Sequence, residues 1–110
     1  MSDYCPNRGD VVWLDFDPQR GHEQAGKRPA LVISPSDYNK RVGLALFCPI
    51  TSQVKGYPFE VKIQLTAIKG VVLADQIKNL DWKARKIKFI EIAPEEIVEE
   101  SKEKLGWLLD

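Results

Sequence analysis

Five polar side chains lie where apolar runs of the sequence give way to loops. Glu23 and Arg28 flank a long polar segment, Thr51 opens a second one, and Asp75-Gln76 closes a further apolar run. A carboxylate takes the proton of a ribose 2′-OH, an arginine holds the charge of a developing phosphorane, and a hydroxyl orients it. Together these residue types predict phosphodiester transfer, for which neither histidine nor a metal ion is obligatory. The general base stays open between Glu23 and Asp75.

Charged and aromatic side chains surround these positions. Lys55, Tyr57 and Phe59 combine a cation with two aromatic rings, a combination that holds single-stranded nucleic acid by phosphate attraction and base stacking. The candidate RNA-contacting residues are Phe16, Lys27, Gln53, Lys55, Tyr57, Phe59, Asp75 and Gln76. We therefore expect an RNA-binding surface beside the catalytic candidates.

Other kinds of site find little support in the sequence. Gly21 and Gly26 lack the spacing of a phosphate-binding loop and do not open a helix. His22 is the only histidine, and Cys5 and Cys48 have no metal-ligand spacing, so we expect no metal, no cofactor and two free thiols. No serine or cysteine has the sequence context of an activated nucleophile.

The net charge is zero, but the charges are unevenly distributed. Residues 19–62 carry seven bases against three acids, residues 69–88 carry six against two, and residues 91–110 carry seven acids against two bases. A basic face can therefore exist on a neutral protein and attract phosphates, although a solvated mixed surface explains the charges equally well. No apolar run approaches the roughly 18 residues that span a bilayer, and the first residues are no secretory signal, so we expect a cytoplasmic protein.

Short strands must position the candidate residues. Two apolar runs, at residues 11–14 and 30–33, are predicted to face each other as strands across a long loop. Further strands are predicted at residues 42–50, 59–65, 71–74 and 87–92, a turn or single helical turn at 34–39, and a turn at 79–83. Cys48 lies in one of the apolar runs and is expected in the core.

The last segment of the chain predicts a helix. Pro94 is pre-organised for a first helical turn, and Glu95 and Glu96 suit the positive end of the helix dipole. Apolar residues then recur at three- and four-residue steps, and Trp107 lies off this stripe, where it is free to cover a partner. About six strands and one terminal helix predict a mainly β fold, a small curled antiparallel barrel, in a single domain of residues 1–110.

Three stretches of the chain carry a specific resemblance. They are GDVVWLDFDPQRGHEQAGKRPALVISP, CPITSQVKGYPFEV and GVVLADQIKNLDWKAR, and the strings E-Q-A-G-x-R-P and K-G-Y-P-F within them are highly specific. They resemble the MazF/PemK/Kid family of toxin endoribonucleases, most closely its MazF branch. The match runs from about residue 4 to residue 94.

The resemblance implies an SH3-like barrel of the CcdB/MazF type that forms a homodimer. It also implies the toxin of a type II toxin–antitoxin system, which cleaves single-stranded mRNA at a short motif without the ribosome and without a metal. The products would carry 2′,3′-cyclic phosphate and 5′-OH ends, and an acidic antitoxin of the MazE kind would wrap and inhibit the enzyme.

The resemblance also assigns roles by position. Arg28 matches the catalytic arginine, Thr51 its hydroxyl partner, and Glu23 the family's acidic loop position. The Kid/PemK branch has an arginine just before the aspartate that matches Asp75. This chain has Leu73-Ala74 there, so the Arg28/Thr51 pair is expected to carry the reaction.

Two alternatives share the same kind of barrel. A non-catalytic poison, such as the gyrase-binding CcdB toxins, acts by protein–protein contact. A simple RNA-binding barrel would bind through Lys55, Tyr57 and Phe59 without cutting. Arg28-Pro29 and Thr51 favour the enzyme.

Overall fold

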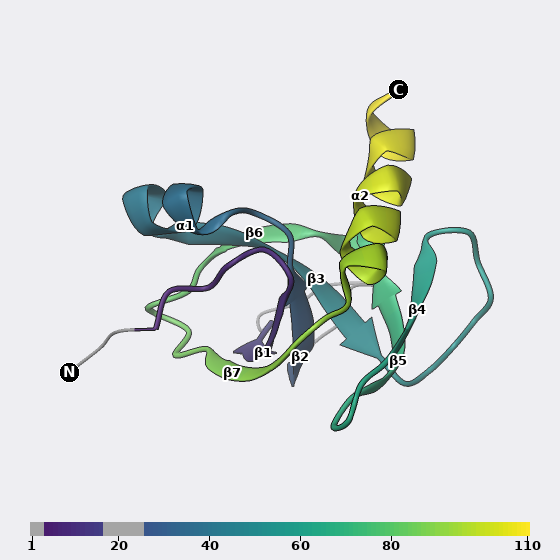
Figure 1. The fold of residues 1–110 in the computed structure, drawn as a ribbon, viewed down its shortest axis with the longest axis horizontal. Helices are drawn as coiled ribbons and strands as arrows, with labels where there is room; N and C mark the ends of the chain where they lie inside the picture. Colours follow the sequence, from purple (N-terminus) through teal and green to yellow (C-terminus); the bar gives the residue numbers. More distant parts are fainter. Residues whose placement is uncertain (1–3, 17–25) are drawn as a thin grey trace.

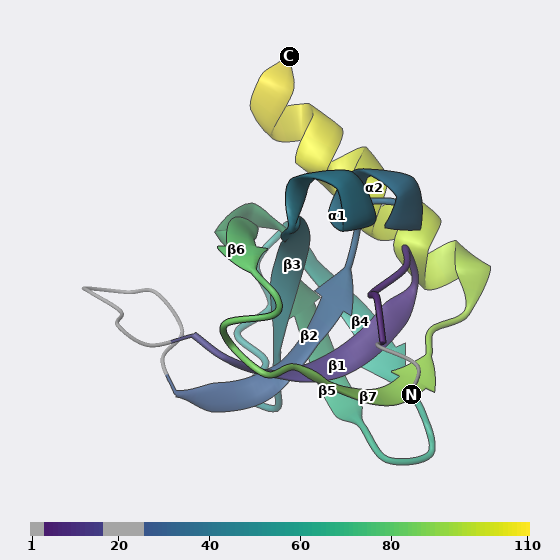
Figure 2. The same cartoon turned by 90° about the vertical axis from the view of Figure 1, so that its left-hand side faces the viewer.

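A curled antiparallel sheet forms the body of the chain, and a long C-terminal helix packs at one end of it (Figures 1 and 2). The computed structural model describes residues 4–16 and 26–110. Its strands are β1 (Asp10–Asp15), β2 (Lys27–Val32), β3 (Leu44–Thr51), β4 (Glu60–Gln64), β5 (Lys69–Leu73), β6 (Lys78–Asp81) and β7 (Lys88–Ile92). Its helices are α1 (Ser36–Val42) and α2 (Glu95–Leu109), with a 3₁₀ turn, η1, at Ala74–Gln76.

The other strands are arranged around β3. Along one edge β3 pairs with β2, with Ala30 opposite Pro49, and along the other edge it pairs first with β6 and then with β5. The sheet order is β4-β5-β3-β2-β1-β7, and β6 lies off this path. The mainly β, curled antiparallel fold with a C-terminal helix is thus confirmed. The end of β3 consequently lies beside both β2 and β5.

Both faces of the central strands are buried, because successive side chains of a strand point to opposite faces. Val12 of β1 belongs to one apolar cluster, whereas Val11 belongs to another that includes Cys48 and Val98 of α2. Cys48 is a free, buried thiol, as expected. Burial raises its pKa to about 12, and the negative charge of Asp75 acts in the same direction.

Two segments differ from the sequence-based expectation. Residues 79–81, predicted as a turn, belong to β6, where Asn79 pairs with Leu46 of β3. Pairing with the central strand outweighs the poor strand propensity of Asn and Asp. Residues 36–42 form α1, which is longer than a single helical turn, and it ends at Gly43 with φ 80°. Glycine adopts this left-handed conformation readily, so the helix stops there and β3 begins one residue later.

The predicted C-terminal helix is confirmed as α2, with Pro94 at its N-cap. Val98 is buried in the core, and Leu105 packs against it partly buried. Leu108 and Leu109 are exposed, Leu109 by 86%, so the apolar stripe continues past the end of the sheet. Among residues 4–16 and 26–110, no helix has the length and apolar character to cross a membrane.

Candidate active site

The tertiary structure brings the predicted pair Arg28 and Thr51 to one place. β2 and β3 pair antiparallel, with Ala30 opposite Pro49 as the last pair, and Arg28 and Thr51 each lie two residues beyond it on their own strand. Both residues line one cavity of about 290 Å³, which we call the Arg28 cavity. Residues two positions apart along a strand point to the same face of the sheet, so Arg28 and Thr51 lie on the face that Ala30 and Pro49 share. A guanidinium and a hydroxyl are thereby available to the same bound group.

Arg28 occupies a different element from the one the sequence indicated. The sequence places it at the end of a long polar segment, but it lies within β2, opposite Leu14 of β1, and is half-buried. Pairing with β1 fixes the backbone from which the Arg28 side chain extends. Strand placement therefore holds the base of this side chain beside the Arg28 cavity.

Thr51 is held by its neighbours on both sides. It is only 5% exposed, and its Oγ1 accepts a hydrogen bond of 3.1 Å from the backbone N–H of Gln53. A Cβ at Gly70 would lie 2.1 Å from the carbonyl oxygen of Thr51, so only glycine permits this approach of β5 to β3. The hydroxyl is consequently fixed at the point where β3 gives way to the following loop.

Five predicted RNA-contacting residues line a second cavity, of about 270 Å³, which we call the Tyr57 groove. They are Gln53, Lys55, Tyr57, Asp75 and Gln76, and Thr51 is part of the same wall. Thr51 therefore borders both the Tyr57 groove and the Arg28 cavity. A polynucleotide bound in the Tyr57 groove could therefore extend past Thr51 into the Arg28 cavity.

A hydrogen bond ties the two sides of the Tyr57 groove together. The hydroxyl of Tyr57 donates to Oδ1 of Asp75 at 2.8 Å. Burial and this hydrogen bond raise the pKa of Tyr57 to about 12, so the hydroxyl stays protonated near neutral pH. Asp75 accordingly faces the groove from η1 and already accepts a hydrogen bond there.

Glu60 was not identified from the sequence, yet it organises the loop that carries Lys55 and Tyr57. Its Oε2 accepts a hydrogen bond from the backbone N–H of Lys55 and its Oε1 accepts one from that of Gly56, each at 2.8 Å. Lys104 of α2 in turn donates from Nζ to the backbone carbonyl of Glu60 at 2.7 Å. A carboxylate a few residues after a Lys-Gly turn was the only signal for this role.

Two predicted RNA-contacting aromatic residues do not line these cavities. Phe16 is 1% exposed and lies in an apolar cluster with Leu14, so its ring is not on the surface where a base would stack. Phe59 is half-buried, and its ring packs edge-on against Trp107 of α2 with ring centroids 5.8 Å apart. Trp107 thus rests partly on its own chain, although 49% of it stays exposed.

Of the remaining candidate residues, some lie in the described structure and others do not. Lys27, in β2, lines the Arg28 cavity. Glu23 and His22 lie outside the residues that the structure describes. Within the described parts of the chain, no three His, Cys, Asp or Glu side chains are grouped to hold a metal ion.

The chain matches a known protein family over most of its length. The family of PemK-like, MazF-like toxins of type II toxin–antitoxin systems matches residues 7–109. The chain belongs to this family. The match includes every strand from β1 to β7, both cavities and the helix α2.

Individual members of the toxin family are close relatives. The endoribonuclease toxin MazF of Escherichia coli is 51% identical over 98 residues, which cover 88% of each chain. A crystal structure of MazF from Deinococcus radiodurans superimposes with a TM-score of 0.93 at 51% identity, over 97% of this chain and 98% of that one. A MazE–MazF structure from the same organism gives a TM-score of 0.85 at 45% identity, over 97% of each chain.

The family and these relatives confirm the function expected from the sequence. The chain is a MazF-type endoribonuclease toxin of a type II toxin–antitoxin system. The 51% identity is to an endoribonuclease, which favours the RNA-cleaving interpretation over a non-catalytic poison or a simple RNA-binding barrel.

Proposed function

We propose that this toxin cleaves single-stranded RNA by internal transfer in the Arg28 cavity. The ribose 2′-oxygen attacks the adjacent phosphorus, a 2′-O–P bond forms, and the bond to the 5′-oxygen breaks. The general base takes the 2′-OH proton and the departing 5′-oxygen takes a proton from water, so one product ends in a 2′,3′-cyclic phosphate and the other begins with a 5′-OH. Arg28 stabilises the charge of the phosphorane, and the Thr51 hydroxyl orients one of its oxygens. The shared cavity of Arg28 and Thr51 is the observation that supports this assignment.

Glu23 is our proposed general base. Asp75, its competitor, accepts a hydrogen bond from Tyr57 in the neighbouring groove, a position that favours contact with a base of the RNA over proton abstraction. Glu23→Gln should therefore slow single-turnover cleavage by roughly 10²–10⁴-fold with little change in RNA affinity. Cleavage by this variant at the wild-type rate would place the base elsewhere.

The Tyr57 groove is proposed to read the cleavage motif. Gln53, Asp75 and Gln76 offer donors and acceptors for base edges, while Lys55 attracts the phosphates. Base edges are accessible in this way only when the RNA is single-stranded, because a double helix hides them in a narrow groove. Selectivity for unpaired RNA follows from this arrangement, and cleavage without the ribosome is proposed from the family resemblance.

We propose two protein partners for the toxin, a cognate antitoxin and a second copy of the same chain. A similar MazF from Deinococcus radiodurans occurs in a MazE–MazF structure, which supports a cognate MazE-like antitoxin. An acidic antitoxin segment would bind across the basic loops, and its association should weaken with salt. The exposed end of α2, with Leu108 and Leu109, supports a homodimer. A monomer in sedimentation at micromolar concentration would contradict the pairing.

One experiment tests the proposed reaction. Purified toxin is incubated with mixed single-stranded RNA, with and without EDTA, and the product ends are sequenced and analysed chemically. We expect cuts at one short motif, unchanged by EDTA, and no cut where a 2′-deoxyribose precedes the scissile bond. Thr51→Val should abolish cleavage, and Thr51→Ser, which retains the hydroxyl, should preserve it. Cutting at the 2′-deoxy position, or loss of activity in EDTA, would refute internal metal-free transfer.

A further inference from the structure

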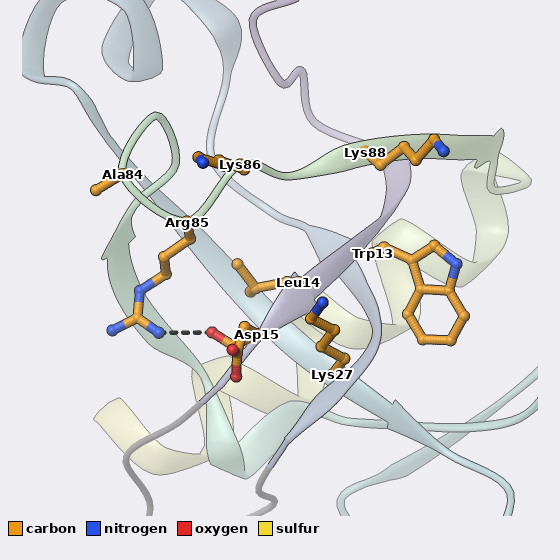
Figure 3. Close-up of a pocket in the computed structure, with 8 residues that line it drawn as sticks. All are labelled: Trp13, Leu14, Asp15, Lys27, Ala84, Arg85, Lys86 and Lys88. Carbon is orange, nitrogen blue, oxygen red and sulfur yellow. Dashed lines mark hydrogen bonds between the residues drawn. The ribbon is translucent and has the colours of Figure 1, made fainter.

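A third cavity, of about 680 Å³, opens where β7 stops pairing with β1, and we call it the Trp13 groove (Figure 3). The last paired residues are Trp13 and Lys88, after which the chain turns away through residues 82–86. Lys27, Arg85 and Lys86 also line the groove. Arg85, Lys86 and Lys88 take no part in the site described above, whereas Trp13 and Lys27 also line the Arg28 cavity.

The Trp13 groove is strongly basic. Four cations, Lys27, Arg85, Lys86 and Lys88, line it against the single carboxylate of Asp15 among the described lining residues. Nη1 of Arg85 donates a hydrogen bond of 2.5 Å to the backbone carbonyl of Asp15, which fixes the turn against the end of β1. Such a concentration of positive charge favours a polyanion.

Trp13 gives this basic groove an aromatic surface. It lies opposite Lys88 on β7 and opposite Pro29 on β2, so the three side chains share one face of the sheet. Trp13 is 45% exposed, and Figure 3 shows it with Lys27 and Lys88 on the same side of β1. A single exposed tryptophan is ordinary on a protein surface, but one set between two lysines is suited to stacking a base between two phosphate contacts.

The Trp13 groove is continuous with the proposed reaction site. Trp13 and Lys27 line both this groove and the Arg28 cavity. Thr51 in turn joins the Arg28 cavity to the Tyr57 groove. The Arg28 cavity therefore has a groove on each side, and a polynucleotide held at its scissile phosphate can extend into both.

We propose that the Trp13 groove is a second RNA subsite, which binds nucleotides flanking the cleavage motif without reading their sequence. A flanking base stacks on Trp13, and Lys27, Lys86 and Lys88 contact the phosphates next to it. Any base can stack on a tryptophan, and a lysine contacts a phosphate whatever base it carries. This subsite therefore strengthens the binding of longer RNA without selecting its sequence. The inference rests on the proposed function, because the flanking RNA reaches the groove only from a scissile phosphate in the Arg28 cavity.

The test compares two substrates with the same motif. One is the minimal cleavable oligonucleotide, and the other is extended by about six unstructured nucleotides on either side, enough to fill a site of this kind. The quantity measured is the ratio of kcat/KM for the extended substrate to that for the minimal one. Wild-type toxin should favour the extended substrate. Trp13→Ala should reduce this ratio about tenfold, as expected for one stacked base, and Trp13→Phe should restore much of it.

Charge variants give a second readout. Lys88→Gln should reduce the dependence of log KM on log salt for the extended substrate by about 0.7, the value for one phosphate contact on a single strand. Lys102→Gln, an exposed lysine of α2 paired with Glu99, is the matched control and should leave both the ratio and the salt dependence unchanged.

Each outcome supports or overturns the subsite. If the wild-type toxin cleaves both substrates equally well, the subsite is refuted while the proposed function stands; if it cleaves neither, the proposed function itself has failed. A wild-type ratio in both Trp13→Ala and Trp13→Phe also refutes the subsite. Weaker binding of an acidic antitoxin peptide by Trp13→Ala and Lys88→Gln, with unchanged RNA ratios, would make the groove a protein site and overturn our assignment.

Discussion

Tyr57 and Asp75 are 18 residues apart in the sequence and meet in a hydrogen bond of 2.8 Å between the tyrosine hydroxyl and Oδ1 of the aspartate. The bond joins the loop after β3 to η1 and closes one side of the Tyr57 groove. It leaves the aspartate able to accept a second hydrogen bond from a nucleobase.

The first prediction separates recognition from chemistry at this pair. Asp75→Asn should change RNA affinity or base preference at one position of the motif, because the side chain keeps its shape but loses its charge. The single-turnover rate at saturating RNA should change by only a few-fold. Tyr57→Phe, which removes the hydroxyl donor, should change the base preference at the same position of the motif. The effects of the two substitutions should not add in the double variant, because the residues are in contact. A rate loss of about 10²-fold in Asp75→Asn would instead make Asp75 the base.

Arg28 is predicted to stabilise the transition state and not the fold. Arg28→Ala should lower kcat on the order of 10²-fold or more, because a fixed charge facing the phosphorane is lost. Arg28→Lys should also be impaired, since lysine keeps the charge but not the planar fork of donors. Thermal melting should shift little, because the side chain lies outside both apolar clusters. A melting temperature that falls together with activity would show that Arg28 is structural.

Glu60 is predicted to position the loop of the Tyr57 groove. In Glu60→Gln one acceptor oxygen becomes an NH₂ group, so one of the hydrogen bonds to Lys55 or Gly56 is lost. We expect a several-fold rise in KM with kcat nearly unchanged. Simple charge removal would attract RNA more strongly and lower KM, so the sign of the change distinguishes the two effects. Glu99→Gln, on the exposed face of α2, is the control and should leave KM unchanged.

Two glycines should respond in opposite ways to the same substitution. Gly70→Ala should destabilise the fold by about 2 kcal/mol or more, since its Cβ would lie 2.1 Å from the carbonyl oxygen of Thr51. Gly106→Ala meets no atom within 4 Å and lies in α2, so it should stabilise by up to about 1 kcal/mol. Urea unfolding measures both. Equal effects of the two substitutions would show that the close contact of β5 with β3 does not exist in solution.

Alkaline pH should weaken the fold through Cys48. Burial raises the pKa of this thiol from 9.0 to about 12, so the unfolded chain ionises first. The contribution is complete below about pH 9 and is lost progressively as the pH rises towards 12. Cys48→Ala should therefore show a shallower loss of unfolding free energy above pH 9 than the wild type. Parallel pH curves for the two proteins would contradict this assignment.

The sequence by itself determined the class of fold and the family. The spacing of apolar residues located the main strands and the C-terminal helix. A strand with one buried face has apolar residues at every second position, and a helix has them at every third or fourth. Local pattern failed where tertiary pairing decides structure. Asn79 is typical of a turn, but in β6 it pairs with Leu46 of β3. The apolar Val42 was predicted to begin a strand, but it is the last residue of α1.

The candidate site divides in the same way. Residue types and the family resemblance singled out Arg28, Thr51 and five residues that line the Tyr57 groove, and their roles stay predictions. Only the tertiary structure placed Arg28 on a strand, buried Phe16, assigned Phe59 to the contact with α2 and gathered Trp13 with Lys88. These features depend on which strands pair and in what register. Register is set by contacts between segments far apart in the chain, which no local pattern contains.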